Sequence, residues 1–252
     1  MQLCEFFNQT PTSMTKYNLP VSADKGTNKT NNAFNRRSFL GYAGISAVTT
    51  ALVLSGCKDD EGNIGLPDAG VNLGSGDIGI LNYAYALEQL EAAFYTQVIM
   101  SKYAGMTAAE EQILTDLRDH EVAHRDFFKA ALGTSAIPNL EVDFSTINFG
   151  NRSSVLATAK TFEDLGVSAY NGAGKLLTDV NLLLIAGKIV SVEARHAAAI
   201  RSLINPNSAD FSGDDVVDAA TGLDIQRMPG DVLMLASPFI KTKINANNLP
   251  TS

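Results

Sequence analysis

The sequence predicts an all-α fold, a four-helix bundle with one long crossover between the second and third helices and an extension after the fourth. Two observations support this prediction. Apolar residues recur at spacings of three and four in four separate stretches, as the buried stripe of a helix requires. The connections between these stretches are short, long and short, so that each closely joined pair of helices must be antiparallel.

The first two helices have the clearest local signals. The first is expected over residues 78–103, with Asp77 as its N-cap. The second begins at Thr107, and Glu110 stands three residues later in the pattern of a capping box, while Gly133 ends the helix. The apolar stripe of the first helix consists of Leu87, Leu90, Phe94 and Val98.

The third and fourth helices form the second closely joined pair. The third is expected over residues 152–174, where Gly172 and Gly174 stop it. The fourth is expected over residues 176–204 and is closed by Asn205–Pro206. The bundle proper is therefore expected to occupy residues 77–205.

The long middle connection decides the topology of the bundle. Residues 133–150 are numerous enough to run back along it, since an extended chain covers up to about 3.3 Å per residue. The alternative is a simple up-and-down bundle with a loose loop. The extension, residues 206–252, contains an apolar stretch at 231–240 that is expected to form a short strand or helix packing on the bundle.

The amino-terminal 56 residues have the features of an export signal. Arg36 and Arg37 precede an apolar stretch, residues 43–54, that is too short to remain as a membrane-spanning helix. The arginine pair resembles a twin-arginine signal, and the residues up to Cys57 resemble a lipobox. We therefore expect cleavage before Cys57 and its lipidation, with an uncleaved membrane anchor as the alternative; Met14 is a second possible start.

Residues 57–76 are expected to form a flexible tether, because Gly, Asn and Pro recur along them. Residues 58–61, a Lys followed by three acidic residues, resemble the short export tag of surface lipoproteins; a solvated linker is the alternative. The expected location is thus the cell envelope, lipid-anchored at the outer membrane or cell surface.

Charge excludes one class of partner. The chain has a net charge of −8, and residues 57–252 alone hold 14 basic and 25 acidic residues, a net charge of −11. Such a surface repels phosphate backbones, so nucleic acid is not an expected partner. No phosphate-binding loop, nucleophile elbow or zinc-ribbon spacing appears in the sequence.

Two helices each carry a Glu three residues before a His, which places a carboxylate and an imidazole on the same helix face. These pairs are Glu121 with His124 and Glu193 with His196. A bundle that binds two metal ions needs one such pair from each of two helices and one further Glu from each of the other two. A single pair of this kind is usually solvated, but here two such pairs fall on the second and fourth expected helices, in the order that the site demands.

An internal repeat selects the two further carboxylates. Residues 88–95 and 163–170 both begin with Glu and end with Tyr, and Gly166 stands where Glu91 would be repeated. Glu91 therefore lacks a counterpart and is the weaker candidate. The repeat favours Glu88 and Glu163 as donors, with Tyr95 and Tyr170 as hydrogen-bond partners that orient them or as plain core residues.

The stretches "LNYAYALEQLEAAFY", "FEDLGVSAY" and "VEARHAAAIR" resemble the ferritin-like domain family, which includes desiccation-related proteins, over residues 77–205. The resemblance implies a ferritin-like bundle with a dinuclear site in which Glu121 and Glu193 bridge the two metals. His120, one turn before His124, is expected at the surface or rim, or as an outer partner of the site. The implied ligands are Glu88, Glu121, His124, Glu163, Glu193 and His196.

Four carboxylates and two imidazoles form a hard, anionic site that suits two iron or manganese ions. The expected function is oxidation of Fe(II) or Mn(II) with O2 or peroxide as the small-molecule substrate, in a stress role. The alternatives are a protein that only holds metal, a structural protein that protects its neighbours, and a hydroxylase, which would need an apolar pocket. An oligomer is compatible with each of these functions.

Overall fold

A computed structural model describes residues 70–251. The expected signal segment 1–56, the lipidation candidate Cys57 and the tag at 58–61 lie outside the described residues. Within residues 70–251, no helix is both long enough and apolar enough to cross a bilayer.

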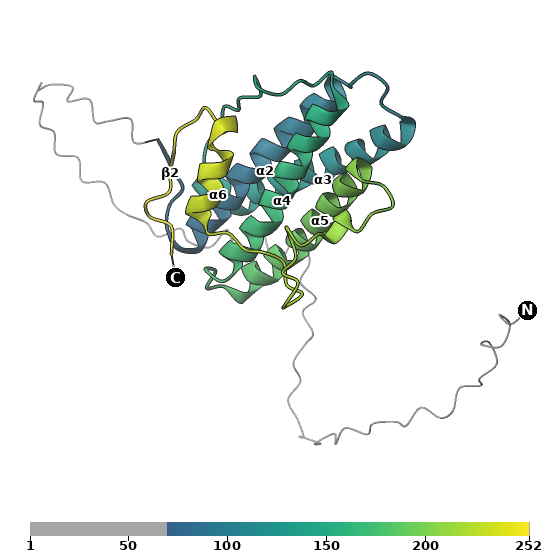
Figure 1. Ribbon diagram of the computed structural model, residues 1–252. Coiled ribbons are helices and arrows are strands. Elements are labelled where there is room, and N and C mark those ends of the chain that lie inside the picture. The colour runs from purple at the N-terminus through teal and green to yellow at the C-terminus, as the bar shows by residue number, and fades with distance from the viewer. Residues whose placement is uncertain (1–69, 252) are drawn as a thin grey trace, which may run out of the picture. The chain divides into compact units, whose positions relative to one another are not determined.

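The described chain is an all-α four-helix bundle, as the sequence predicts (Figure 1). α2 packs mainly against α3, and α4 packs mainly against α5, while the segment at 133–151 crosses from α3 to α4. The four helices are α2 (Gly76–Met100), α3 (Ala108–Leu132), α4 (Arg152–Gly174) and α5 (Val180–Ile204).

The ends of α3 agree with the local signals in the sequence. Thr107 is the N-cap, and its hydroxyl accepts a hydrogen bond from the Glu110 N–H at 3.2 Å. The Glu110 carboxylate accepts in return from the Thr107 N–H at 2.9 Å, which completes the capping box. Gly133 follows the helix with a φ of 55°, a conformation that glycine adopts without strain.

The expected start of the first helix was wrong by two residues. Ser75 is the N-cap of α2, and Asp77 lies in the first turn. The carboxylate of Asp77 accepts hydrogen bonds from the N–H groups of Thr178 and Asp179 instead. Asp179 in turn caps α5, so this helix begins at Val180 and not at residue 176. The partner of Asp77 is thus remote in sequence, and no local pattern indicates it.

Gly172 does not stop the third helix, contrary to expectation, since α4 continues to Gly174. Its role is to allow a close crossing of the chain. An ideal Cβ at Gly172 would lie 1.8 Å from the carbonyl oxygen of Arg227, which is far inside a van der Waals contact. The Arg227 N–H donates to the Ser168 carbonyl at 2.9 Å, so the extension lies directly on α4.

The extension forms a helix within the expected apolar stretch, and this helix, α6 (Pro229–Ala236), packs on α4. The described residues also contain three single 3₁₀ turns: η1 (Gly133–Ser135), η2 (Asp210–Ser212) and η3 (Ser237–Phe239). The carbonyl of Phe239 accepts from the Asp143 N–H at 2.8 Å, which joins the extension to the crossover segment.

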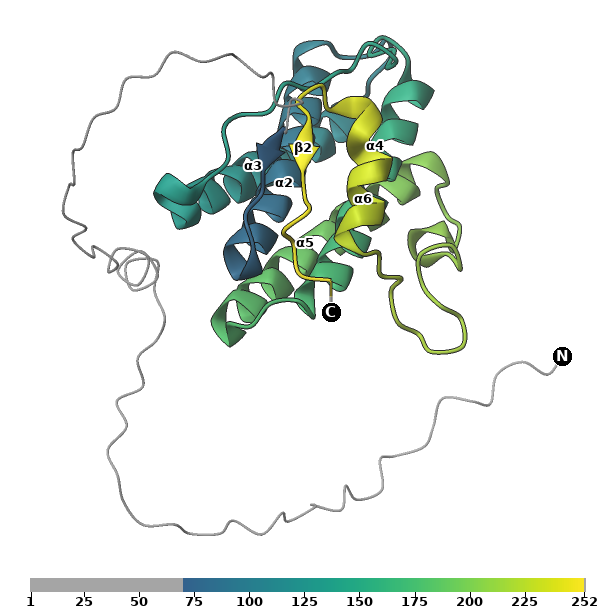
Figure 2. The ribbon, with the colours of Figure 1, turned by 90° about the vertical axis from the view of Figure 1, so that its left-hand side faces the viewer.

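The expected tether is too long by several residues. β1 (Val71–Asn72) pairs in parallel with β2 (Ile244–Asn245), as Figure 2 shows. Leu73, which follows β1, is fully buried. The chain before α2 is therefore held by the extension from residue 71 onward. The sequence did not indicate this, because the strands that pair are far apart in the chain.

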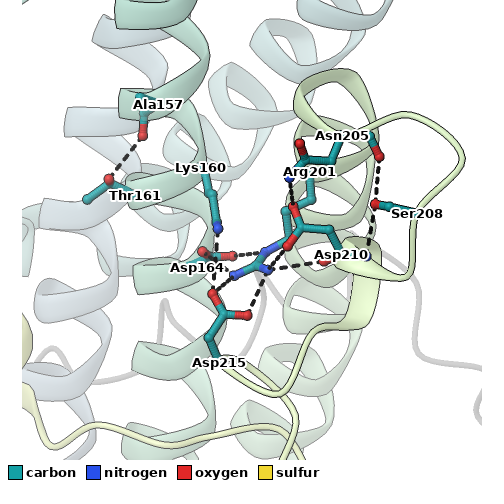
Figure 3. Close-up of polar contacts among 9 residues, drawn as sticks. All are labelled: Ala157, Lys160, Thr161, Asp164, Arg201, Asn205, Ser208, Asp210 and Asp215. Carbon is teal, nitrogen blue, oxygen red and sulfur yellow. Dashed lines mark hydrogen bonds and ion pairs between the residues drawn. The ribbon is translucent and has the colours of Figure 1, made fainter.

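A buried arginine fixes the beginning of the extension (Figure 3). Arg201 on α5 is 1 % exposed, and its guanidinium donates to both oxygens of Asp164 on α4, at 2.9 and 2.7 Å. The same guanidinium reaches Asp210 and Asp215 of the extension, with the closest contact at 2.8 Å. One cation thus ties α4, α5 and the extension together.

Candidate metal centre

The four helices bring all six predicted ligands to the centre of the bundle. The four glutamates have no exposed surface, His196 is buried, and the side chain of His124 is 14 % exposed. α2 and α4 contribute one glutamate each, and α3 and α5 contribute one Glu–His pair each. The side chains are Glu88 from α2, Glu121 and His124 from α3, Glu163 from α4, and Glu193 and His196 from α5.

These side chains form two groups of four possible metal donors. Within each group, one donor atom from every residue lies within 4.8 Å of the others. Glu121 and Glu193 belong to both groups, which is the arrangement that two bridging carboxylates would have. The first group adds Glu88 and His124, and the second adds Glu163 and His196.

Both imidazoles present Nδ1 to the carboxylates. His124 Nδ1 lies 2.9 Å from Glu193 Oε1 and 3.4 Å from Glu88 Oε2. His196 Nδ1 lies 2.8 Å from Glu121 Oε1 and 3.5 Å from Glu163 Oε2, on the other side of the cluster. Each imidazole therefore faces a different set of oxygens, as separate terminal ligands of two ions would.

Many of these atoms are buried and make no well-oriented hydrogen bond among the described residues, although each Nδ1 lies close to one carboxylate oxygen, at 2.9 Å for His124 and 2.8 Å for His196. They include both oxygens of Glu121 and of Glu193, one oxygen each of Glu88 and Glu163, and Nδ1 of both histidines. Buried polar atoms without such bonds are costly, and a coordinated ion would account for them. The donor set of oxygens and imidazole nitrogens fits iron or manganese.

Burial is the main influence on the pKa values in the cluster. It raises the pKa of Glu88 to about 7 and holds the pKa of Glu193 well above its usual value. Burial acts on Glu121 in the same direction, but the nearby His124 and His196 outweigh it and lower the pKa of Glu121 to about 2. Glu121 also helps to raise the pKa of His196 to about 10, against the effect of burial. The cluster thus attracts positive charge, which a bound cation would supply.

Two tyrosines hold the carboxylates crosswise. Tyr95 on α2 donates its hydroxyl to Glu163 Oε1 on α4 at 2.5 Å. Tyr170 on α4 donates its hydroxyl to Glu88 Oε1 on α2. Each Glu–Tyr repeat of the sequence therefore supports the glutamate of the other repeat and leaves the second oxygen of that glutamate for a metal ion.

His120 is an exposed residue, as expected, but it also contacts the cluster. Its Nδ1 lies 2.9 Å from Nε2 of His196, and the two rings are nearly parallel. This contact leaves Nδ1 of His196 directed at the carboxylates. His120, His124 and His196 line a groove of about 390 Å³ between α3 and α5, so the histidine side of the cluster has an approach from solvent.

A second pocket, which is apolar, lies between the helices. Its walls come mainly from α2, α4 and the first half of α5, with Phe128 from α3, and they include the rings of Tyr83 and Tyr170. The Tyr83 hydroxyl is buried and has no hydrogen-bond partner among the described residues. The pocket offers about 20 Å³ of free space, enough for roughly one water-sized molecule and too small for a larger organic substrate.

Glu91, the weaker candidate in the sequence, belongs to neither group of donors but lies beside them. It is 4 % exposed, and its carboxylate lies against Gly166 at the edge of the cluster. The absence of a repeated Glu at position 166 was interpreted as a mark against Glu91. The donor groups agree with that ranking, and the structure adds that glycine at 166 leaves room for the Glu91 carboxylate, since an ideal Cβ there would lie 3.1 Å from Glu91 Oε1.

Comparison with known proteins agrees with this geometry. A model of a family described as the ferritin-like domain matches residues 76–206, just over half of the chain. This range begins with α2, ends after α5, and includes all six predicted ligands. No curated protein matches the chain.

Proposed function

The chain belongs to the ferritin-like domain family, and from this premise we propose that it binds two iron or manganese ions and couples their oxidation to the reduction of O2 or peroxide. The observation that carries the proposal is the pair of buried donor groups that share Glu121 and Glu193. A relationship to desiccation-related proteins and a role in stress protection are part of the same proposal.

Each residue then has a definite task. Glu88 and His124 would hold one ion and Glu163 and His196 the other, while Glu121 and Glu193, which belong to both donor groups, would be shared between them. Four carboxylates neutralise two divalent ions, so the reduced site carries no excess charge inside the apolar bundle. Sulfur ligands are absent from the donor groups, which disfavours copper(I) and structural zinc.

Two divalent ions bound at this position would supply two electrons to O2 or peroxide. The protein contributes orientation and controlled access. Tyr95 and Tyr170 fix the two terminal glutamates through hydrogen bonds from the opposite helix. The groove beside His124 and His196 gives ions and small polar molecules an approach, while the apolar pocket has little room for a larger substrate, which argues against hydroxylation of one.

We also propose that the protein is exported and lipid-anchored in the cell envelope through Cys57. The support comes from the order of the sequence signals, namely Arg36 and Arg37, the apolar stretch and the lipobox-like residues before Cys57. Labelling cells with a radioactive or clickable fatty acid tests this proposal. Label is expected in the wild type and absent from Cys57→Ser.

Elemental analysis of protein beginning after Cys57, produced with iron and manganese supplements, tests metal binding. We expect about two ions per chain and their loss in a Glu121→Ala, Glu193→Ala double variant. Glu141→Gln, which removes an exposed carboxylate from the crossover, is the matched control and should keep its metal. Absence of metal from the wild type would overturn the proposal.

Oxidation of added Fe(II) or Mn(II), followed under O2 and separately with peroxide, then tests the chemistry. Multiple turnovers in the wild type and their absence in the double variant are expected. Bound metal without turnover would instead identify a protein that holds metal without catalysis.

A further inference from the structure

His120 is in direct contact with one of the two histidines of the centre, although it belongs to neither group of donors. It lies on α3, and its Nδ1 is 2.9 Å from Nε2 of His196 on α5. The planes of the two rings differ by 5°, and their centres are 5.1 Å apart. The contact therefore joins two helices at the outer nitrogen of a predicted ligand.

The direction of this hydrogen bond follows from the opposite edge of the His196 ring. His196 Nδ1 faces the carboxylates and lies 2.8 Å from Glu121 Oε1. A ring nitrogen that coordinates a metal ion carries no hydrogen, so the hydrogen of the neutral ring must be on Nε2. His196 Nε2–H then donates to Nδ1 of His120. A His196 ring protonated at both nitrogens donates in the same direction, so the contact can exist before an ion is bound.

His120 must be neutral in order to accept this hydrogen bond. Partial burial lowers its pKa, and the neighbouring imidazoles of His196 and His124 act in the same direction, so the neutral ring is the favoured form. A group that accepts from the outer nitrogen of a metal-binding histidine fixes both the tautomer and the orientation of that ring. His120 has the position and the protonation state for this role.

The second metal-binding histidine has no matching contact from the other helix of the pair. His120 stands four residues before His124 on α3, and Val192 stands four residues before His196 on α5. Both His120 and Val192 line the groove between the two helices. The side chain of Val192 has no atom that forms a hydrogen bond, so this position offers His124 no counterpart of the contact that His196 receives.

The two imidazoles also differ in their exposure to solvent. The side chain of His124 is 14 % exposed, whereas that of His196 is 4 % exposed. A ring that is buried and held at its outer nitrogen loses less freedom when it binds an ion, and such preorganisation increases affinity. The two halves of the centre are therefore built differently on their histidine side.

We propose that His120 positions His196 for metal binding and thereby makes the two ion positions unequal, the one formed with Glu163 and His196 being the tighter. This inference deepens the proposed function and rests on it. His120 acts through His196 and is a positioning residue, not a ligand. The ion beside His124 is consequently the one that exchanges more readily with the groove.

A titration of metal-free protein with Mn(II), followed by the electron paramagnetic resonance signal of free Mn(II), tests this inference. The wild type should bind about two ions per chain, one of them more tightly than the other. His120→Phe keeps a flat ring beside His196 and removes the acceptor. The tighter step should therefore weaken about 10- to 100-fold, the usual effect of losing such an outer contact, while the weaker step stays unchanged.

Two further variants separate positioning from packing. His120→Asn places an amide oxygen where Nδ1 stood, so it can still accept from His196 and should bind nearly as the wild type does. Val192→Ala alters the wall of the same groove without changing a hydrogen bond and should bind both ions normally.

Two ligand variants then assign the two steps. In His124→Ala, the remaining ion should be weakened when His120→Phe is added. In His196→Ala, the remaining ion should be indifferent to His120→Phe, because the contact through which His120 acts is already lost. An equal or reversed dependence would overturn the proposed inequality.

The failures of the two proposals differ in what they show. Wild-type protein that binds no Mn(II) would overturn the proposed function itself. Two bound ions with an unchanged tighter step in His120→Phe would overturn only the positioning role. Equal losses in His120→Phe and His120→Asn would also overturn it, because packing alone would then explain them. If His120→Phe does not fold, His120→Ala replaces it under the same criteria.

Discussion

At the scale of single residues, the centre depends on hydrogen bonds that cross between the two halves of the bundle. Tyr95 and Tyr170 each hold a glutamate from the other Glu–Tyr repeat. One oxygen of each glutamate is thereby occupied, and the other remains without a hydrogen-bond partner among the described residues. Outer partners of this kind orient a ligand before the metal arrives, which lowers the entropic cost of binding.

Tyr170→Phe should therefore weaken metal binding without unfolding the protein. The variant removes the hydroxyl that orients Glu88, and loss of such a partner typically reduces affinity about 10- to 100-fold. Competition with a chelator for bound Mn(II) measures the change. Tyr103→Phe removes another buried hydroxyl that lies near Glu110 and outside the cluster, and should bind as the wild type does. Equal affinity in the two variants would contradict the orienting role.

The ion pairs of Arg201 with Asp164, Asp210 and Asp215 should make the stability of the fold depend on pH, and the pKa of Asp215 gives the direction. The hydrogen bond from Arg201 is the main reason that the pKa of Asp215 is lowered from 3.8 to about 2. A carboxyl group with a lowered pKa in the folded state adds stability above its unfolded pKa and loses that contribution as the pH falls. The contribution is therefore complete above about pH 4 and disappears as the pH falls through about 2.

Melting temperatures of the wild type and Asp215→Asn should thus differ at pH 5 to 7 and converge as the pH falls toward 2. Asp215 is more than half exposed, so the expected difference is small and its sign is the informative part. Asp214→Asn removes the neighbouring charge and serves as the control. A difference between wild type and Asp215→Asn that grows on acidification would show that the ion pair does not stabilise the fold.

At the scale of elements, the sequence predicted a helix end correctly where the capping residues are close together in the chain. The prediction failed where the candidate cap has a partner far away in sequence. The capping box at Thr107 and Glu110 needs residues three positions apart, and α3 begins as predicted. Asp77 is of a residue type that often caps helices and lies at the start of α2, yet its carboxylate accepts hydrogen bonds from the backbone just before α5. The choice between the two roles depends on how the helices are arranged.

Gly172 illustrates the same point for the extension. A glycine near the end of a helical pattern is usually a stop signal, but here it lies inside α4 under the carbonyl of Arg227. The extension crosses α4 at this position, with hydrogen bonds from Arg227 to the Ser168 carbonyl and hydroxyl. Backbone contact therefore requires glycine where local helix propensity would prefer alanine.

Gly172→Ala should destabilise the protein by roughly 1–3 kcal/mol, the usual range for a group forced into a filled site. The reason is that the added methyl group must displace the chain at Arg227. Gly174→Ala is the matched control, since its nearest neighbour would be Leu183 Cδ1 at an ordinary 3.5 Å. Urea denaturation compares the two variants, and equal stabilities would contradict the close crossing.

At the scale of the whole molecule, the bundle places four buried carboxylates around one point, an arrangement that disfavours the metal-free fold. Burial and mutual repulsion both act against their ionised forms. A bound metal pair would relieve both effects at once, and its ligands would come from all four helices. Metal binding and folding stability should therefore be coupled.

The melting temperature should accordingly rise when Mn(II) is added to metal-free protein and fall again with a chelator. At a free metal concentration 100 times the dissociation constant, the gain is about 2.7 kcal/mol for one site. Scanning calorimetry of the wild type and of Glu121→Ala, Glu193→Ala measures it. The double variant should show no shift, and a shift of equal size would place the responsible ions elsewhere.

The sequence by itself determined the four helices, the crossover and the six residues that converge on the centre. These features are encoded locally, in the helical period, in the Glu–x–x–His spacing and in the repeat that begins at Glu88 and Glu163. The four-helix fold is confirmed, and the six side chains meet as expected. Their occupation by metal stays a prediction.

Only the tertiary structure decided which residues of different helices contact one another. It placed Glu91 over Gly166, crossed the two tyrosines between the repeats and brought His120 against His196. It also ended the tether at β1, which pairs with the far end of the chain. Each of these contacts joins residues far apart in sequence, so its existence depends on the distance between backbones, which no local pattern of residues specifies.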